Sequence, residues 1–299
     1  MCNYLVSVII PTYKRSDMVD ASITSILKQT YSNVEIIVVD DNDPDTEWRK
    51  KTESKMNKYS LDSRIKYIKH NKNMNGSVAR NTGIANSSGE LVAFLDDDDM
   101  FYPSKIEKQV EFLIKNPQFR AVYCGWLRDD QCTVSYHEGD LSFDILSGCN
   151  IIYTNAIMMW KEDAIMCGGW DVTFKRHQEA AFLLRFFREG GKIGVVPEVL
   201  VSFDTSDRSN EAKNSIVYEE QMDHLLNSFE SLIDECERSK KGAKKFIFCN
   251  RYRGVLFAHV KNKNIKSAVS LYLRMILRYP LAYNINIIYY IINRLFRSK

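Results

Sequence analysis

The stretch GELVAFLDDDD at residues 89–99 decides the fold, because an apolar run passes directly into four consecutive aspartates. A solvated acidic run normally lies among other polar residues, whereas Asp96–Asp99 directly follow Leu91–Leu95 and are closed off by Pro103. The apolar run predicts a buried strand, with the aspartates at its carboxyl end. Carboxylates this close repel one another, and a hard divalent cation is the usual way to neutralise them. The stretch therefore predicts a metal-binding loop, with an acidic surface loop as the alternative.

The residues before this stretch alternate between short apolar runs and helical patterns. The expected strands are Leu5–Ile10, Val34–Val39 and Ile65–Ile68, and the expected helices are Asp17–Gln29, Glu47–Lys58 and Gly76–Ala85. Short β-branched runs separated by helices predict a parallel sheet covered on both faces. In such sheets ligands bind at the carboxyl ends of the strands. Two further strands end in polar clusters, at Pro11–Arg15, where the proline is expected to stop the strand, and at Asp40–Asn42.

Four segments resemble family 2 glycosyltransferases of the GT-A fold. They are VSVIIPTYKR at 6–15, VVDDN at 38–42, NG at 75–76 with ARNTGIA at 79–85, and GELVAFLDDDD at 89–99. Their order and spacing match over residues 5–103, and a weaker match continues to about 205. The resemblance implies an α/β fold, a Rossmann-like GT-A domain with a mostly parallel sheet flanked by helices, followed by a C-terminal helical extension. The expected boundaries are a nucleotide-sugar-binding half at 1–103, an acceptor-binding half at 104–215 and a basic helical extension at 216–299.

The resemblance also implies a donor site for a nucleoside diphosphate sugar. Thr12 and Tyr13, just past Pro11, are expected to cradle the base, with Arg15 beside them. Asp41, with Asp40 next to it, is expected to accept a hydrogen bond from the base. For these two aspartates a helix cap or Asx turn is the alternative.

The remaining donor residues are implied by the same resemblance. Arg80 is expected to face the diphosphate, with a surface salt bridge as its alternative. Asp96 or Asp97 is expected to contact the ribose, and Asp99 to face the sugar or the water shell of the metal. Asp98, together with Asp96, is expected to hold Mn²⁺ or Mg²⁺, which suit an all-oxygen site.

Glu179 is the expected catalytic base. The segments CGGWD at 167–171 and HQEAAFLLR at 177–185 resemble the Gly-Gly-aromatic-Asp turn of the family and its later helix with an acidic pair. The base takes the proton from the acceptor hydroxyl as that oxygen attacks the anomeric carbon. Two departures are that Glu179 replaces the usual Asp and that Ala181 occupies a position that is often acidic. A helix cap is the alternative for Glu179, His177 is the nearest substitute base, and Trp170 is a candidate for stacking on a sugar ring.

The charge is divided unevenly along the chain. Fifteen of the 41 basic side chains and none of the 38 acidic ones lie from Arg238 onward, among aromatic and aliphatic residues. This pattern predicts helices that lie on an anionic inner-leaflet membrane surface, with packed helices bearing a solvated face as the alternative. No motif of a nucleic-acid reader accompanies the charge, so no nucleic-acid partner is expected. No stretch is long and apolar enough to cross a membrane.

The seven cysteines are scattered without CxxC spacing, so reduced thiols are expected and a zinc site or disulfide framework is not. The chain opens directly on an apolar strand, so no signal peptide is predicted. The expected location is therefore cytoplasmic, peripheral at the cytoplasmic face of the plasma membrane if the tail binds lipid.

The function implied by the resemblance is metal-dependent transfer of a sugar from a nucleoside diphosphate donor to an acceptor hydroxyl, with inversion. A UDP-sugar is the first choice of donor. The expected partners are that donor and a glycan or lipid-linked glycan acceptor in surface polysaccharide assembly. A polar segment, Val201–Asn210, is expected to be a lid or an ordinary loop. One alternative is a nucleotidyltransferase, which normally shows a Gly-rich loop after the first strand that Pro11–Arg15 lacks. The other is a non-catalytic sugar-nucleotide binder.

Overall fold

The computed structural model describes residues 3–206 and 214–297. It divides into two compact units, one formed by Met1–Leu141 with Ile152–Arg208 and the other by Ser142–Ile151 with Ser209–Lys299. The short segment Ser142–Ile151, which the sequence places with the sheet, thus belongs to the second, helical unit.

The first unit is built on one sheet with the strand order β3-β2-β1-β4-β8-β6-β9-β5, with β7 added at β6. The first four strands in this order are parallel, as the sequence predicts, whereas beyond β4 antiparallel pairs enter at β8, β7 and β5. The strands are β1 Val6–Thr12, β2 Val34–Asp40, β3 Ile65–Lys69, β4 Leu91–Phe94, β5 Met100–Phe101, β6 Ala121–Arg128, β7 Gln131–Thr133, β8 Met158–Trp160 and β9 Ile193–Ser202.

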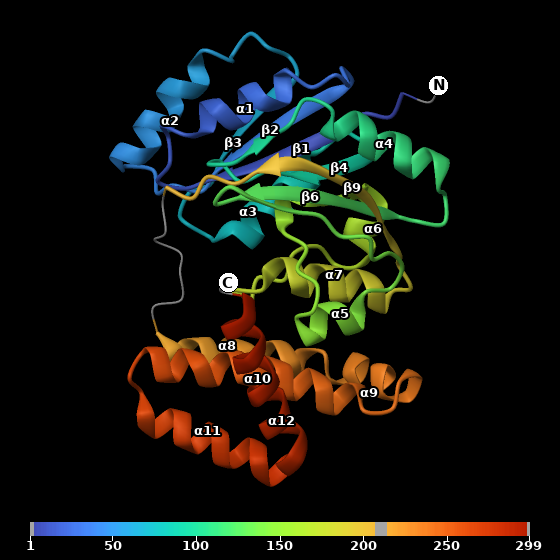
Figure 1. Cartoon of the computed structure of the whole chain (residues 1–299). Helices are drawn as coiled ribbons and strands as arrows, with labels where there is room; N and C mark the ends of the chain where they lie inside the picture. Colours follow the sequence, from blue (N-terminus) through green and yellow to red (C-terminus); the bar gives the residue numbers. More distant parts are fainter. Residues whose placement is uncertain (1–2, 207–213, 298–299) are drawn as a thin grey trace. The chain divides into compact units, whose positions relative to one another are not determined.

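Helices cover both faces of this sheet (Figure 1). One face carries α1, α2 and α4, and the other carries α3, α6 and α7. β1, β2 and β4 are almost entirely buried between these layers, which explains their nearly uniform apolar sequences. The helices are α1 Val19–Leu27, α2 Glu47–Asn57, α3 Gly76–Asn86, α4 Lys105–Lys115, α6 Lys161–Met166 and α7 Gln178–Arg188, with the 3₁₀ turn η1 at Thr154–Ala156.

α3 packs closely on β1 because Gly83 has no side chain. A Cβ at this position would lie 2.3 Å from Cγ2 of Ile9, well inside van der Waals contact. The close approach brings the N-terminal turns of α3 to the carboxyl ends of β1 and β4, where the site is built.

β1 continues through Pro11 to Thr12, so the expectation that the proline ends the strand is wrong. β1 pairs with β4 only as far as Ile9, whose carbonyl accepts from Leu95 N at 3.0 Å. Alternate residues of a strand face the same neighbour, so Pro11 faces the β4 side, where the ladder has already ended. The missing N–H therefore breaks no sheet hydrogen bond, and the carbonyl of Thr12 still accepts from Asp41 N on the β2 side (2.9 Å).

The second unit is helical. Its helices are α5 Ser142–Ser147, α8 Ser215–Ser228, α9 Glu230–Ser239, α10 Ala243–Lys261, α11 Ile265–Arg278 and α12 Pro280–Arg297. Side chains of α10 hold α5 in place: Arg251 Nε donates to the carbonyl of Leu146 at 2.7 Å, and Asn250 Nδ2 donates to that of Ser147 at 2.8 Å. A helix able to span a bilayer is absent from residues 3–206 and 214–297.

Candidate active site

The four aspartates leave the end of β4 as a tight loop held at its backbone. Ser22 Oγ, from α1, donates to the carbonyls of Asp97 and Asp99, both at 2.9 Å. Asn155, from η1, accepts from Asp96 N at 3.0 Å and donates through Nδ2 to the Asp99 carboxylate. The second oxygen of Asp99 accepts from Asp204 N at 2.8 Å. Asp99 is thus turned into the protein, while the other end of the loop remains accessible.

Arg15 provides the counter-charge for the middle of the loop. Its Nη1 lies 2.5 Å from Asp98 Oδ2 and 3.6 Å from Asp97 Oδ1. Burial is the main cause, and the charges of the neighbouring carboxylates a further one, that together raise the pKa of Asp97 to about 7, of Asp98 to about 6 and of Asp99 to about 9. The ionised loop therefore lacks positive charge even with Arg15 in place, and an added cation would stabilise it.

Arg80 joins the loop to the start of α7. Its Nη2 lies 2.6 Å from Asp96 Oδ1, and its Nη1 donates to Gln178 Oε1 at 3.0 Å. The guanidinium lies 4.8 Å from the ring centroid of Trp170, which stacks on Phe182 at 4.5 Å. Arg80 is therefore an internal bridge between two predicted parts of the site, β4 and α7.

Trp170 is 1% exposed. The side chain of Asn81 holds its backbone: it accepts from the backbone N–H of Trp170 and donates to the backbone carbonyl, both at 2.8 Å. The expectation that Trp170 stacks on a sugar is therefore wrong, because its ring lies in the core. Gly169, at φ +66°, allows the turn before it, since a Cβ there would lie 2.6 Å from Asn81 Oδ1. The Gly-Gly-aromatic segment thus positions Arg80.

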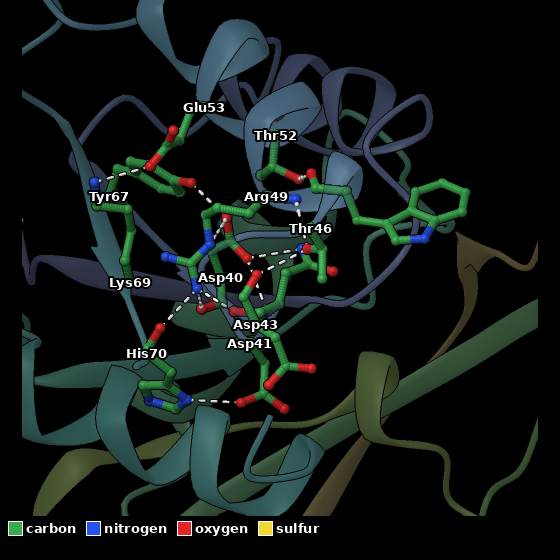
Figure 2. A network of polar contacts seen from close by, with 12 residues as sticks. Asp40, Asp41, Asp43, Thr46, Arg49, Thr52, Glu53, Tyr67, Lys69 and His70 are labelled. Atoms are coloured by element: carbon green, nitrogen blue, oxygen red, sulfur yellow. Dashed lines mark hydrogen bonds and ion pairs between the residues drawn. The ribbon is translucent and has the colours of Figure 1, made fainter. Parts of the chain in front are cut away.

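Asp40, at the end of β2, is wholly enclosed by polar partners (Figure 2). Arg49 Nε lies 3.2 Å from its carboxylate, the Tyr67 hydroxyl donates to it, and Asn42 donates through both its backbone and side-chain nitrogens. Arg49 also donates to the carbonyl of His70 at 2.7 Å. Asp40 therefore fixes the carboxyl ends of β2 and β3, and a direct contact with a base would require this network to open.

Asp41 organises the loop that precedes α3. Its Oδ1 lies 2.7 Å from His70 Nδ1 and accepts from Met74 N at 2.8 Å; its Oδ2 accepts from Asn73 Nδ2 and from Asn75 N, both at 2.9 Å. His70 contacts Asp41 in Figure 2. Both carboxylate oxygens are thus already engaged, and the loop they hold carries the amides and the Asn73 side chain beside the donor segment of β1.

Residues 11–15, here called the donor segment of β1, lie next to the loop of the four aspartates 96–99, here called the acid loop. Tyr13 N donates to Asp97 Oδ2 at 3.4 Å, and the Tyr13 ring is 39% exposed with Lys14 Nζ 4.9 Å from its centroid. Thr12 is buried and Pro11 is partly exposed. The structure therefore brings Pro11, Thr12, Tyr13 and Arg15 together with Asp97 and Asp98, as the sequence predicts.

Glu179 lies in the first turn of α7, partly buried, directly after Gln178. His177 caps this helix in the left-handed region (φ 58°). The Arg80 bridge from Gln178 to Asp96 brings this turn to the acid loop. The structure thus joins the helix turn that carries the predicted base to the acid loop, through the neighbouring Gln178.

The donor set of the acid loop matches a hard cation in chemistry but is incomplete on its own. Across the described ranges, no group of three or more His, Cys, Asp or Glu side chains is arranged to hold a metal ion. Asp97 and Asp99 are buried, whereas Asp96 and Asp98 are partly exposed, so these two, now paired with Arg80 and Arg15, are the carboxylates that a ligand can reach. Mg²⁺ in particular is usually bound by one or two carboxylates together with substrate phosphates, which fits such a pair.

The sequence did not predict four residues that build the site. Ser22, Asn155, Asp204 and Gln178 hold the acid loop or its arginine; Gln178 and Asp204 lie in segments that the sequence analysis names, without this role, and Ser22 and Asn155 lie in no motif. The one available signal is position, since Asp204 follows the end of β9 and Gln178 opens α7. Of the expected lid, residues 207–210 lie outside the described residues.

Comparison with known proteins follows the same outline. A family model described as glycosyl transferase family 2 matches residues 7–169. The UDP-Glc:alpha-D-GlcNAc-diphosphoundecaprenol beta-1,3-glucosyltransferase WfgD of Escherichia coli is 41% identical over 116 residues, which cover 39% of this chain and 44% of WfgD. An uncharacterised glycosyltransferase of Haemophilus influenzae is 32% identical over 221 residues, 67% of this chain and 65% of that protein. The chain thus spans less than half of WfgD.

Solved structures share the fold. The mannosyltransferase PcManGT from Pyrobaculum calidifontis, in complex with GDP-Man and Mn²⁺, superposes with a TM-score of 0.61 at 16% identity over 99% of this chain and 88% of that one. S. aureus TarS 1–349 in complex with UDP-GlcNAc gives 0.60 at 15% identity, over 95% and 89%. These likenesses confirm the predicted GT-A fold.

Proposed function

The chain belongs to glycosyl transferase family 2, whose model it matches over more than half its length, and from this premise we propose that it transfers a sugar from a nucleoside diphosphate donor to an acceptor hydroxyl. The observation that carries the proposal is the acid loop at the end of β4, which Arg15 and Arg80 join to the donor segment of β1 and to the first turn of α7. Carboxylates, two arginines and a candidate base thereby meet at one edge of the sheet.

A UDP-sugar is the proposed donor. WfgD is named for UDP-Glc, and TarS was solved with UDP-GlcNAc. Tyr13, at the end of β1, offers an exposed ring on which a base can stack. Asp40 and Asp41, whose oxygens are occupied in the structure, would act by fixing the β2 end and the 73–75 loop, which would line the base pocket.

Asp98 and Asp96 would hold Mn²⁺ or Mg²⁺. When bound, such a cation offsets the charge that develops on the departing nucleoside diphosphate. Arg15 and Arg80, which now neutralise these two carboxylates, would lie next to the same diphosphate and supply further positive charge.

Glu179 would accept the proton of the acceptor hydroxyl as the oxygen attacks the anomeric carbon. The proposed reaction is a single displacement with inversion, which needs one base. The proposed acceptor is a glycan linked to a lipid diphosphate, in surface polysaccharide assembly, as the name of WfgD suggests.

Incubation with UDP-, GDP- and dTDP-sugars tests this proposal. We expect nucleoside diphosphate release from a UDP-sugar with Mn²⁺ or Mg²⁺, and none with EDTA. Enzymes of this kind leak some sugar to water, so release is measurable without the acceptor. Metal-dependent binding of a donor without any turnover, in the presence of a lipid-linked acceptor, would instead favour a non-catalytic binder. Absence of metal-dependent binding to every donor would exclude the transferase.

We further propose that α12 binds an anionic membrane surface at the cytoplasmic face of the plasma membrane. Its inner side is anchored to α10 by Tyr283, which is buried and donates to the carbonyl of Tyr252 at 3.1 Å. Its opposite side carries an outer stripe, here defined as Leu281, Ile285, Ile288 and Ile292, whose members are 45–74% exposed. These positions recur at the i, i+4, i+7, i+11 spacing of one helix face.

The positive charge around the outer stripe favours an anionic lipid surface as its binding partner. No acidic residue follows Glu237 in the sequence, and Arg278 and Arg294 are exposed on the helices that carry or precede the stripe. An apolar face with basic residues and no acidic ones matches anionic headgroups over an acyl boundary.

Cosedimentation with vesicles tests the membrane proposal. We expect the protein to bind phosphatidylcholine vesicles that contain phosphatidylglycerol, to bind pure phosphatidylcholine far less, and to lose binding as salt rises. Ile288→Asp with Ile292→Asp should weaken binding at least about tenfold, because two charges replace apolar groups that would insert into the membrane. Val217→Asp, at an exposed position of α8, is the matched control. Unchanged binding in the double variant would contradict the proposal, and a dimer in solution that the double variant abolishes would assign the stripe to a second copy.

A further inference from the structure

Three aromatic side chains cluster where β6 and β9 end. Trp126 lies edge-on to Tyr153 with ring centroids 5.1 Å apart, and Tyr153 lies 5.0 Å from Phe203. Phe203 follows β9 and is tied to β6, since its N–H donates to the carbonyl of Leu127 at 2.9 Å. Trp126 is 6% exposed, whereas Tyr153 and Phe203 are partly exposed. A buried ring thus supports two rings that present apolar surface to solvent.

A residue close in sequence to each partly exposed ring forms a hydrogen bond with the acid loop. Tyr153 lies two residues before Asn155, which contacts both Asp96 and Asp99. Phe203 immediately precedes Asp204, whose N–H donates to Asp99. The two rings are therefore fixed to the reacting edge of the sheet by short, hydrogen-bonded segments, and a ligand on them would lie beside the acid loop.

The rings lie on the side of the acid loop that the donor residues do not use. Arg15 and Arg80 contact Asp98 and Asp96, and they come from β1 and α3, on the parallel half of the sheet. The segments that carry the aromatic pair hold the loop at Asp99, through Asn155 and Asp204, and they come from the mixed half of the sheet, around β6 and β9. A two-substrate transferase needs a second subsite in such a place.

We propose that Tyr153 and Phe203 form the platform on which the acceptor saccharide stacks. A sugar ring has one apolar face and a rim of hydroxyls, so a pair of exposed aromatic rings offers the matching surface. The inference rests on the proposed transferase function and specifies its acceptor subsite.

Arg128 adds a cation to the rim of this platform. Its Nη1 donates to the Tyr153 hydroxyl at 3.3 Å, and its guanidinium carbon lies 5.8 Å from the ring centroid. The side chain is otherwise exposed at the end of β6. A saccharide with a phosphate attached to it would gain a charge-assisted hydrogen bond there that a neutral glycoside would not.

Ligand-detected NMR with two probes tests the platform. The probes are methyl N-acetylglucosaminide and N-acetylglucosamine linked through a diphosphate to a short alkyl chain, both at up to millimolar concentration. We expect Tyr153→Ala to weaken binding of both probes about tenfold or more, the loss expected for one aromatic contact. Tyr153→Phe should keep both affinities within about twofold, and Arg128→Gln should weaken only the diphosphate probe.

Donor hydrolysis without acceptor, measured on the same preparations, separates this proposal from the proposed function. Hydrolysis by the parent tests the proposed function, whereas Tyr153→Ala tests only the binding of the two probes. Trp48→Ala, which removes a comparably exposed ring from α2, is the matched control for both assays. If Tyr153→Ala does not fold, Phe203→Leu gives the second test.

Equal binding by Tyr153→Ala and the parent, or failure of the parent to bind either probe, would overturn the platform. A parent that hydrolyses no donor would refute the transferase function instead, and the binding results would still decide whether a saccharide platform exists.

Discussion

Asp98→Asn is expected to reduce metal-dependent release of nucleoside diphosphate at least about a hundredfold, the scale seen when an electrostatic stabiliser of the transition state is removed. Asp98 and Asp96 are the two carboxylates of the acid loop that a ligand can reach, since they are partly exposed while Asp97 and Asp99 are buried. Asparagine keeps the shape of the side chain and removes its charge. Binding of Mn²⁺ in the presence of UDP, followed by calorimetry, should fall together with turnover.

The fold of this variant should be intact, because the substitution removes one charge from a crowded acidic loop. Melting temperature therefore serves as the control measurement, and Asp62→Asn, which removes a partly exposed charge paired with Arg64 at a position distant in sequence from the loop, serves as the matched variant. Full activity in Asp98→Asn would move the metal to other ligands. Full activity in EDTA would leave Arg15 and Arg80 as the cations that neutralise the leaving group.

The parallel half of the fold could be predicted from the sequence because its strands are buried on both faces. β1, β2 and β4 are continuous apolar runs, and their carboxyl ends carry the polar clusters that form the site. The part of the sheet beyond β4, where antiparallel pairs enter, has weaker sequence signals of its strands. β8 has only three residues, Met158–Trp160, and is preceded by a 3₁₀ turn, so its sequence alone resembles a longer strand.

Pro11 misled the prediction of a strand end for a physical reason, and Pro197 lies inside β9 for a related one. A proline ends a strand only where its missing N–H would be needed by a neighbour. Pro11 faces the side where β4 has already diverged. Pro197 lies in a bulge, since Cys124 pairs with Val196 while Gly125 pairs with Val199. Neither fact is written in the local sequence.

The site itself was predictable as far as its motif residues go. The acid loop, Arg15, Arg80 and the first turn of α7 meet as expected, although no residue pattern shows that Arg80 links Asp96 to Gln178. The roles of Asp40 and Asp41 were harder to assign, because a carboxylate that binds a base and one that fixes a loop look alike in sequence. Here the partners show that both aspartates fix loops: Arg49, 9 residues after Asp40, pairs with Asp40, and His70, 29 residues after Asp41, pairs with Asp41.

Glu179→Gln is expected to lower the rate of sugar transfer about 10²- to 10⁴-fold, the range for loss of a general base, while the KM for the donor changes little. The glutamine keeps the length of the side chain and cannot take the acceptor proton. Glu179→Asp, which restores the acid usual in the family, should retain more activity than Glu179→Gln. The measurement is initial rate against donor and acceptor concentration for the parent and both variants.

The alternative role of Glu179 as a helix-start charge predicts a different result. In that case Glu179→Gln would lose about 0.3–1 kcal/mol of stability, seen as a lower Tm, and would keep its rate of transfer. Glu189→Gln, an exposed acid at the other end of α7, controls for charge on this helix. His177→Gln completes the set, because an unchanged rate in Glu179→Gln together with a large loss in His177→Gln would assign the base to the histidine. A loss confined to Glu179→Gln, with Tm near that of the parent, would identify Glu179 as the residue that accepts the proton.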